Sequence, residues 1–348
     1  MIHASPTVSQ EALDLYRACD VIDLHVDTFI WTRIFRYDLL RRHGRGLLGA
    51  RFYGQADLPR LREAGVGGAI WSITTNPLRR AARRTAVFRA NLERLVAIFA
   101  RAPAEVALCR SAADYRAARA AGRHAAFVGI QGGNALDGDL ALASFDASLL
   151  VKVTLVHLST SSLGTTSAPS FGGVVGRGDG GLSERGRELV ASLDRHRIFV
   201  DLAHINRRGF FDAVAAHDRT RPLLVSHTGI AGVHRHWRNV DDEQLRAVAA
   251  TGGVVGVMYQ SSFLGEPLFG GRAEAIVDHL AHIVDVAGED CAALGSDWDG
   301  AIVTPRDMAT CLELPLLCEL MLRRGWRPER VRKILGGNFL RALEALRG

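Results

Sequence analysis

The chain has 348 residues, of which 48% are hydrophobic, and its formal net charge at pH 7 is +6. This length suits two ordinary domains or a single α/β barrel. No uninterrupted apolar run approaches 18 residues, which argues against a membrane-spanning helix. The scattered arginines include no aromatic-interleaved basic motif of the kind that binds nucleic acid.

Strand-like segments recur along the chain, and helical patterns lie between most of them. The expected strands are 21–27, 67–75, 125–131, 149–158, 198–205, 222–228, 253–260 and 292–300. The expected helices are 80–101, 108–121, 183–196, 207–217, 241–250, 271–287 and 307–324. Such alternation builds parallel βαβ units, and eight strands of this kind predict an α/β fold, a closed (β/α)8 TIM barrel. We expect one domain over residues 1–348, with a helical extension at 1–20 and a C-terminal helix at 326–348 that packs on the barrel.

Three other features exclude alternatives. The glycine-rich stretch 171–181 does not run from a strand directly into a helix, so it predicts a loop and not a dinucleotide-binding turn. The five cysteines form no CxxC pair and are odd in number, which indicates reduced, buried thiols and not a disulfide framework or a zinc-thiolate site. The first twenty residues lack a secretory signal pattern, and the expected location is cytoplasmic.

Polar side chains gather at the expected strand ends. In the first strand, Asp23, His25 and Asp27 alternate with apolar residues and therefore share one face. The other strand-end residues are Gln131, His157, His204, His227 and Asp297. In a (β/α)8 barrel all these ends meet at one mouth, where active sites are built. Imidazoles and carboxylates are the usual ligands of zinc and similar divalent ions, so the joint pattern predicts a metal-dependent hydrolase.

Hydrolysis at such a site needs few further groups. The metal ion activates water near neutral pH and polarises the scissile carbonyl. Asp297, at the end of the eighth expected strand, fits a carboxylate that accepts the proton of the water and passes it to the leaving amine. His157 could hydrogen-bond the developing oxyanion. Asp23 lies one period deeper along its strand, and we interpret it as structural.

Nine motifs occur in this order along residues 21–346: DLHVD, GIQGGNAL, LVHLS, GLSERGRELV, VDLAHI, LLVSHT, RNVDDEQLRAVAATGGVVGV, GSDWDG and VRKILGGNFLR. Together they resemble the renal (membrane) dipeptidase family, which belongs to the amidohydrolase-type metal barrels. The resemblance implies a two-zinc dipeptidase on a (β/α)8 barrel. It also implies cleavage of dipeptides, often with a D-residue at the C-terminal position, and a homodimeric assembly.

The resemblance implies that His25 and Asp27 bind one zinc ion and that His204 and His227 bind the other. The third expected strand departs from the family pattern, which reads Glu-Gly-Gly-His with the Glu bridging both ions. Gln131 stands in the place of that Glu. A neutral amide offers one carbonyl oxygen to one ion and cannot supply an anionic bridge. We therefore expect one or two divalent ions, with zinc as the preferred metal and Gln131 as an altered ligand.

On the substrate side, the resemblance implies that Asp297 is the acid/base and that His157 contacts the substrate and the tetrahedral intermediate. Arg238 matches the arginine that pairs with the C-terminal carboxylate of the substrate. Asn134 replaces the family histidine as a candidate substrate contact, and Val26 replaces an Asn. Two interpretations follow. In the first, the chain still hydrolyses dipeptides or a related small amino-acid amide. In the second, the barrel serves a different reaction, or only binding, in the metabolism of an amino-acid derivative.

The expected partner is a dipeptide-like small molecule, and neither nucleic acid nor a membrane. An arginine run follows the first expected strand and comprises Arg33, Arg36, Arg41, Arg42 and Arg45. If these side chains overhang the mouth, their charge would favour anionic substrates.

Overall fold

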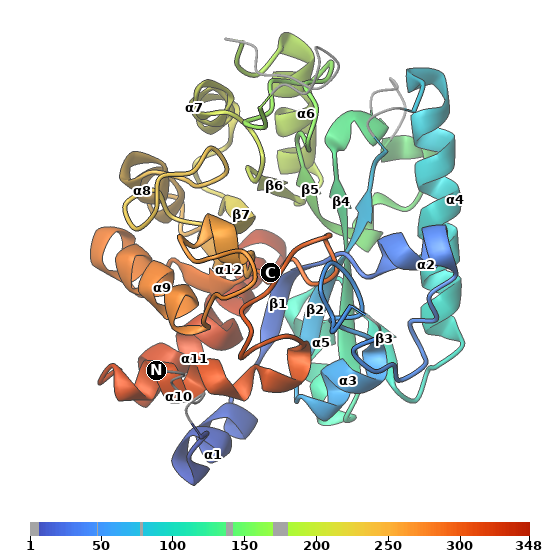
Figure 1. Ribbon diagram of the computed structural model, residues 1–348. Helices are drawn as coiled ribbons and strands as arrows, with labels where there is room; N and C mark the ends of the chain where they lie inside the picture. Colours follow the sequence, from blue (N-terminus) through green and yellow to red (C-terminus); the bar gives the residue numbers. More distant parts are fainter. Residues whose placement is uncertain (1–6, 47, 77–78, 137–141, 170–179) are drawn as a thin grey trace.

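The computed structural model describes residues 7–46, 48–76, 79–136, 142–169 and 180–348. Eight parallel strands lie at the centre of the molecule, and helices surround them (Figure 1). The strands are β1 (Ile22–Val26), β2 (Gly68–Thr74), β4 (His124–Gln131), β5 (Leu150–Thr154), β6 (Phe199–Asp201), β7 (Leu224–Thr228), β8 (Val254–Val257) and β9 (Ala292–Leu294). The structure confirms the predicted α/β barrel.

The ring closes between β1 and the segment that follows β9. The backbone N–H of Asp297 donates to the carbonyl of His25 (3.0 Å), and the N–H of Asp27 donates to the carbonyl of Trp298 (2.8 Å). The remaining neighbours pair in the order β1-β2-β4-β5-β6-β7-β8-β9. A short additional strand, β3 (Val106–Leu108), pairs with β4 off this ring. Closure brings the carboxyl ends of the first and last barrel strands into direct contact.

Polar side chains cap the first turn of several helices. Ser111 and Asp241 each accept the N–H three residues ahead, in capping boxes completed by Asp114 and Gln244. The helices are α1 (Gln10–Ala18), α2 (Phe29–Phe35), α3 (Leu58–Glu63), α4 (Ala81–Ala100), α5 (Ala112–Ala120), α6 (Glu184–Arg195), α7 (Arg207–Ala216), α8 (Asp242–Ala249), α9 (Glu274–Ala287), α10 (Pro315–Arg323), α11 (Pro328–Arg332) and α12 (Asn338–Arg347). Helix α1 packs against α10.

All eight expected strands are present, but four of them, β5, β6, β8 and β9, were predicted too long by four or more residues. Strands β5, β6 and β9 end three residues before His157, His204 and Asp297, so these side chains lie on the loops that leave the sheet. The apolar run continues past the last ladder hydrogen bond, which is why the pattern did not show the true ends. The short elements α2, α3 and β3 were not predicted, because they contain too few residues to show a period.

Residues 326–348 form more than the single helix expected there. Helix α11 continues through a π-helical segment (Lys333–Gly337) into α12. Phe339 of α12 is 1% exposed, and its ring centroid lies 5.6 Å from that of Phe127 and 6.0 Å from that of Phe199. These two partners come from β4 and β6 and point into the barrel, so α12 closes the end of the barrel opposite the mouth.

The remaining expectations concern the cysteines, the membrane and the glycine-rich stretch. All five cysteines are buried and free, as the sequence indicates. None of the helices in the described ranges has both the length and the apolar character of a bilayer span. The predicted loop at 171–181 lies outside the described residues, apart from its last two glycines.

Replacing Phe339 with Ala should destabilise the protein by about 3–5 kcal/mol, because the substitution removes a buried aromatic ring and leaves a cavity at the barrel floor. Urea unfolding followed by circular dichroism measures this loss. Ile34 on α2 is 59% exposed, so Ile34→Ala is the control and should change the free energy of unfolding by less than about 0.5 kcal/mol. Equal effects of the two substitutions would contradict the assignment of α12 as the floor.

Candidate metal centre

The predicted site residues come from six different strands or the loops that follow them. His25 lies on β1 with Asp27 directly after it, Gln131 is the last residue of β4, and His227 lies on β7. Three more sit at equivalent places, each three residues beyond the end of its strand: His157 after β5, His204 after β6 and Asp297 after β9. All of them face the carboxyl end of the barrel, where parallel strands present functional groups.

Two of these residues have an unusual backbone. His204 has φ of 68° and Asp297 has φ of 64°, in the left-handed region that non-glycine residues rarely occupy. Gly132, directly after Gln131, has φ of 99°, which a side chain would oppose. Such conformations cost about 1–3 kcal/mol each and persist where the surrounding structure enforces them, often at functional sites. Here they turn the chain sharply at the strand ends.

One half of the cluster consists of imidazoles. The Nε2 atoms of His204 and His227 lie 2.9 Å apart, and the side-chain nitrogen of Gln131 lies 3.2 Å from the first and 3.4 Å from the second. The His25 ring packs against the His227 ring at a centroid distance of 3.8 Å, and the His157 ring meets the His204 ring edge-on at 4.6 Å. The four imidazole rings therefore lie against one another in one small volume.

The other half of the cluster carries the carboxylates. His25 Nε2 lies 3.5 Å from Asp27 Oδ1 and 3.7 Å from Asp297 Oδ1. The hydroxyl of Thr74, at the end of β2, lies 2.9 Å from Asp27 Oδ1 and 3.0 Å from Gln131 Oε1. Thr74 was not predicted as a site residue, and it links the two halves of the cluster by fixing both side chains.

The ionisation states differ between the groups. Burial lowers the pKa of His25, His204 and His227, so these imidazoles are neutral near pH 7. Burial opposes ionisation of Asp27, but its polar neighbours His25 and Thr74 more than offset this and leave the Asp27 pKa below its usual value. Burial, reinforced by the charge of Asp27, raises the pKa of Asp297 well above its usual value. Such a split separates an ionised carboxylate from one that holds a proton more readily.

These residues fit a divalent cation. His25, His227 and Asp297 each offer one potential ligand atom, and these three atoms lie within 4.8 Å of one another. His25 Nε2 and His204 Nδ1 are buried and lack a hydrogen-bond partner among the described residues. Neutral imidazole nitrogens and carboxylate oxygens in one buried cluster are the donors that zinc and related ions take. The arrangement can therefore hold a metal ion that activates water.

The two remaining predicted residues, Arg238 and Asn134, differ in their contacts with this cluster. Arg238 is buried, and its Nη2 donates to the backbone carbonyl of His227 (2.7 Å). Burial lowers the Arg238 pKa to about 10, and the charge of Asp297 opposes that shift. Asn134 is also buried, in the turn after β4. Within the described chain, its side chain makes no hydrogen bond to the histidines or carboxylates of the cluster.

A buried polar network next to the cluster escaped the sequence analysis. Lys152 on β5 and Asp201 on β6 form an ion pair (2.8 Å) with neither side chain exposed. Ser226 Oγ donates to Asp201 Oδ2 (2.6 Å) and lies 2.9 Å from His227 Nδ1. The signal in the sequence was a charge inside an apolar strand, in a chain whose only other lysine is Lys333.

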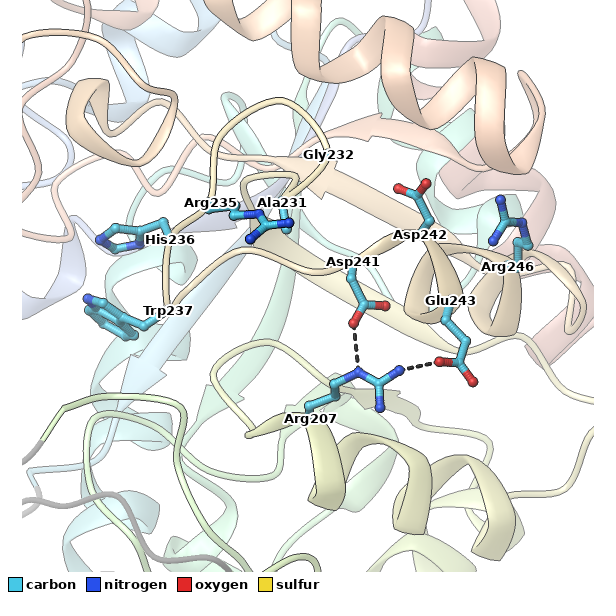
Figure 2. A pocket seen from close by; sticks show the side chains of 10 residues that line it. All are labelled: Arg207, Ala231, Gly232, Arg235, His236, Trp237, Asp241, Asp242, Glu243 and Arg246. Atoms are coloured by element: carbon cyan, nitrogen blue, oxygen red, sulfur yellow. Dashed lines mark hydrogen bonds and ion pairs between the residues drawn. The ribbon is translucent and has the colours of Figure 1, made fainter.

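An open pocket of about 780 Å³ lies beside the loop that carries Arg238 (Figure 2). Arg207 crosses it and pairs with both Asp241 and Glu243. The pocket contains none of the predicted ligands, so its size does not mark it as the reaction site. Its lining consists of Arg207, Ala231, Gly232, Arg235, His236, Trp237, Asp241, Asp242, Glu243 and Arg246.

The sequence matches the membrane dipeptidase family (peptidase family M19) over residues 9–347. The chain belongs to the membrane dipeptidase family. Members of this family are metal-dependent, and this chain is a metallopeptidase of the dipeptidase type.

Solved structures extend the comparison. The chain is 28% identical to dipeptidase AC, a metallopeptidase of the same family, with a TM-score of 0.80 over 94% of this chain and 98% of the other. A Rhodobacter sphaeroides metallopeptidase, solved with a phosphinate mimic of the dipeptide L-Ala-D-Ala, is 26% identical, with a TM-score of 0.79 over 94% and 99% of the two chains. A probable dipeptidase from Pseudomonas aeruginosa shares the fold, with 17% identity and a TM-score of 0.82 over 97% and 98%.

Acidification should destabilise the metal-free dipeptidase below pH 6.5. The unfolded chain binds protons on its histidines from about pH 6.5 downwards, while burial keeps His204 and His227 neutral to lower pH in the folded state. The free energy of unfolding should fall by up to about 1.4 kcal/mol per pH unit for each such histidine. Urea titrations at several pH values measure this slope, and His227→Gln should make it shallower. An unchanged slope in the variant would refute the neutral state of His227.

Proposed function

We propose that this dipeptidase hydrolyses the amide bond of a dipeptide, or of a related small amino-acid amide, at the candidate metal centre. The observation that carries the proposal is the convergence of neutral imidazoles and carboxylates from separate strands on one buried volume. The proposed ligands are His25, Asp27, His204 and His227, with Gln131 as an altered fifth. Zinc is the proposed metal because the donors are mainly imidazole nitrogens.

The bound ion would lower the pKa of a water molecule and polarise the scissile carbonyl. Asp297 is proposed as the acid/base, since its raised pKa suits a carboxyl that takes a proton from water and returns it to the leaving amine. His157 stands against His204 at the edge of the cluster, where its ring could donate to the developing oxyanion.

Recognition of the substrate is proposed to rest on Arg238 and, to a smaller extent, on Asn134. A guanidinium can pair with a carboxylate through two parallel hydrogen bonds. Arg238 uses Nη2 to hold the carbonyl of His227, which ties its orientation to a proposed metal ligand. The relative that binds a mimic of L-Ala-D-Ala supports a dipeptide with a D-residue at its C-terminal position.

The arginine run after β1 contributes less to the attraction of anionic substrates than its charge suggests. Arg42 pairs with Glu63 and Arg45 pairs with Glu313, so both face carboxylates of the protein. Arg33 donates to the carbonyl of Thr74 (2.8 Å), beside the cluster, and is the member of the run that we propose to favour anionic substrates.

The number of metal ions depends on Gln131. Its amide nitrogen faces both His204 and His227, whereas its oxygen accepts from Thr74. Rotation of the amide would present the oxygen to a metal ion instead, but a neutral oxygen offsets no positive charge. We therefore propose one firmly held ion. A homodimer and a cytoplasmic location also remain proposals, the first supported by the family resemblance and the second by the five free, buried thiols.

Purified protein should hydrolyse at least one dipeptide in a panel of L,L and L,D pairs when zinc, cobalt or manganese is supplied. Release of free amino acids, measured by a ninhydrin or coupled assay, gives the rate. Asp297→Asn should lower kcat by about 10²–10⁴-fold, since the general acid/base is lost. No turnover by the wild-type protein with any of these metals would favour the alternative of a binding barrel or a different reaction.

Asp23→Asn is the matched control for Asp297→Asn. Asp23 is a buried carboxylate on the same barrel, and its Oδ1 accepts the backbone N–H groups of His25 and Ser296. An amide oxygen can accept both, so turnover and metal content should change little. Metal content of the Asp297 variant should also stay unchanged, and its loss would make Asp297 a ligand and not the acid/base.

Gln131→Glu should raise the metal occupancy, because it places an anionic oxygen between His204 and His227 at nearly constant volume. Elemental analysis after dialysis against a fixed free zinc concentration counts the ions per chain. We expect a gain of up to one ion over the wild-type protein. An unchanged count in a folded variant would show that the missing charge at position 131 does not limit binding.

A further inference from the structure

The barrel interior contains a fixed cation directly behind the candidate metal centre. Lys152 is completely buried, and its Nζ lies 2.8 Å from Asp201 Oδ2, 3.0 Å from Ser226 Oγ and 3.0 Å from His25 Nδ1. The Thr154 hydroxyl is a further neighbour at 3.1 Å. An ammonium has three hydrogens and no lone pair, so it can only donate to these partners.

The fold makes room for this side chain. Gly129 on β4 lies against the lysine stem, and a Cβ at that position would come within 2.8 Å of Lys152 Cγ. Asp201 is held in turn by the hydroxyls of Thr154 and Ser226 and by the backbone N–H groups of Ser226 and Ala203. The Lys152–Asp201 pair is therefore an enclosed, fully hydrogen-bonded unit.

The Lys152–Asp201 pair and its neighbours give His227 and His25 different hydrogen-bonding partners at Nδ1. Ser226 Oγ donates to Asp201, so its lone pair can accept a proton from His227 Nδ1, 2.9 Å away. A proton on Nδ1 leaves the Nε2 lone pair of His227 free to face the metal centre. A histidine that ligates a metal usually donates its other ring nitrogen to an acceptor in this way, and losing such a partner typically changes metal affinity by about 10–100-fold.

His25 has the opposite arrangement. Its Nδ1 faces the Lys152 ammonium at 3.0 Å, whereas the possible acceptors Ser72 and Ser226 lie farther away, at 3.3 Å and 3.5 Å. Donation from Lys152 places the lone pair on Nδ1 and the ring proton on Nε2, where it faces Asp27 and Asp297. That is the wrong tautomer for binding a metal through Nε2.

The charges around the centre lead to the same conclusion. Asp23, Asp27, Asp201 and Asp297 are buried there, against the two buried cations Lys152 and Arg238. The Lys152 ammonium lies 3.0 Å from His25 Nδ1, so its positive charge opposes the binding of a further cation at this ligand.

We propose that Lys152 is a positioning residue that makes His25 the weaker metal ligand, so that this centre binds one divalent ion tightly and a second one poorly. The proposal rests on the proposed function for its ligand set. It adds a second reason for the single ion, besides Gln131: an internal ammonium that keeps the ring proton of His25 on Nε2, which lies 3.5 Å from Asp27 Oδ1 and 3.7 Å from Asp297 Oδ1.

Metal titration of the purified full chain tests this. Zinc binding is measured by competition with a chromophoric chelator, and bound zinc is counted by elemental analysis. The wild-type protein should show one tight site. Lys152→Gln supplies an amide oxygen that can accept from His25 Nδ1, and it should tighten the second site by about 10–100-fold. Lys152→Met removes the donor without adding an acceptor and should give a smaller gain. Lys333→Gln, at the other lysine, should change nothing.

A second variant covers the risk that an unpaired Asp201 prevents folding. Lys152→Gln with Asp201→Asn removes both charges of the pair together, and it should bind the second ion as tightly as the single variant. The ¹⁵N NMR signals of His25, assigned from a His25→Asn spectrum, should show an unprotonated Nδ1 in the wild-type protein and a protonated Nδ1 in the variant.

Two results would overturn the proposal. One is a wild-type protein with two equally tight sites, which decides the matter even if no variant folds. The other is a folded Lys152→Gln variant, single or double, that still binds one ion. Both remain distinct from failure of the proposed function, because dipeptide turnover by the wild-type protein is measured separately and depends on neither result.

Discussion

The closure of the barrel between β1 and the segment after β9 is the constraint on which the site depends. Two backbone hydrogen bonds make the closure, and both involve residues of the candidate metal centre: Asp297 donates to His25, and Asp27 donates to Trp298. The contacts that complete the ring thus also bring two carboxylates to one imidazole. A barrel that failed to close here would separate Asp297 from His25. The same backbone contacts therefore complete the fold and assemble the candidate metal centre.

The interior of this barrel is polar at one end and apolar at the other. Near the floor, Phe127, Phe199 and Phe339 pack ring against ring. Near the mouth, carboxylates, imidazoles and the Lys152 ammonium fill the same cross-section. Burying these charges is costly unless each finds a partner. The Lys152–Asp201 pair supplies one such partner within the protein, whereas the carboxylates closer to solvent are arranged so that a bound cation can complete the balance.

Much of the fold followed from sequence periodicity, because each barrel strand is an apolar run between polar or glycine boundaries. The strand-end histidines and aspartates were also visible, since their residue types are unusual beside such runs. The left-handed turns at His204 and Asp297 were not, because backbone dihedrals there are imposed by neighbouring strands. The contacts of Lys152 with His25 and Asp201 join β1, β5 and β6, and no local pattern encodes a contact between strands so far apart in the chain. The role of Arg238 came from the family resemblance alone.

The floor helix has a consequence for how the protein is made. Phe339 closes an interior whose walls begin at Ile22, so the apolar end of the barrel lacks its cover until α12 has also been synthesised. Before that moment the nascent strands expose their floor-facing side chains, in a topology whose contacts join distant segments and form slowly. Docking of α12 is therefore the step that removes this apolar surface from water.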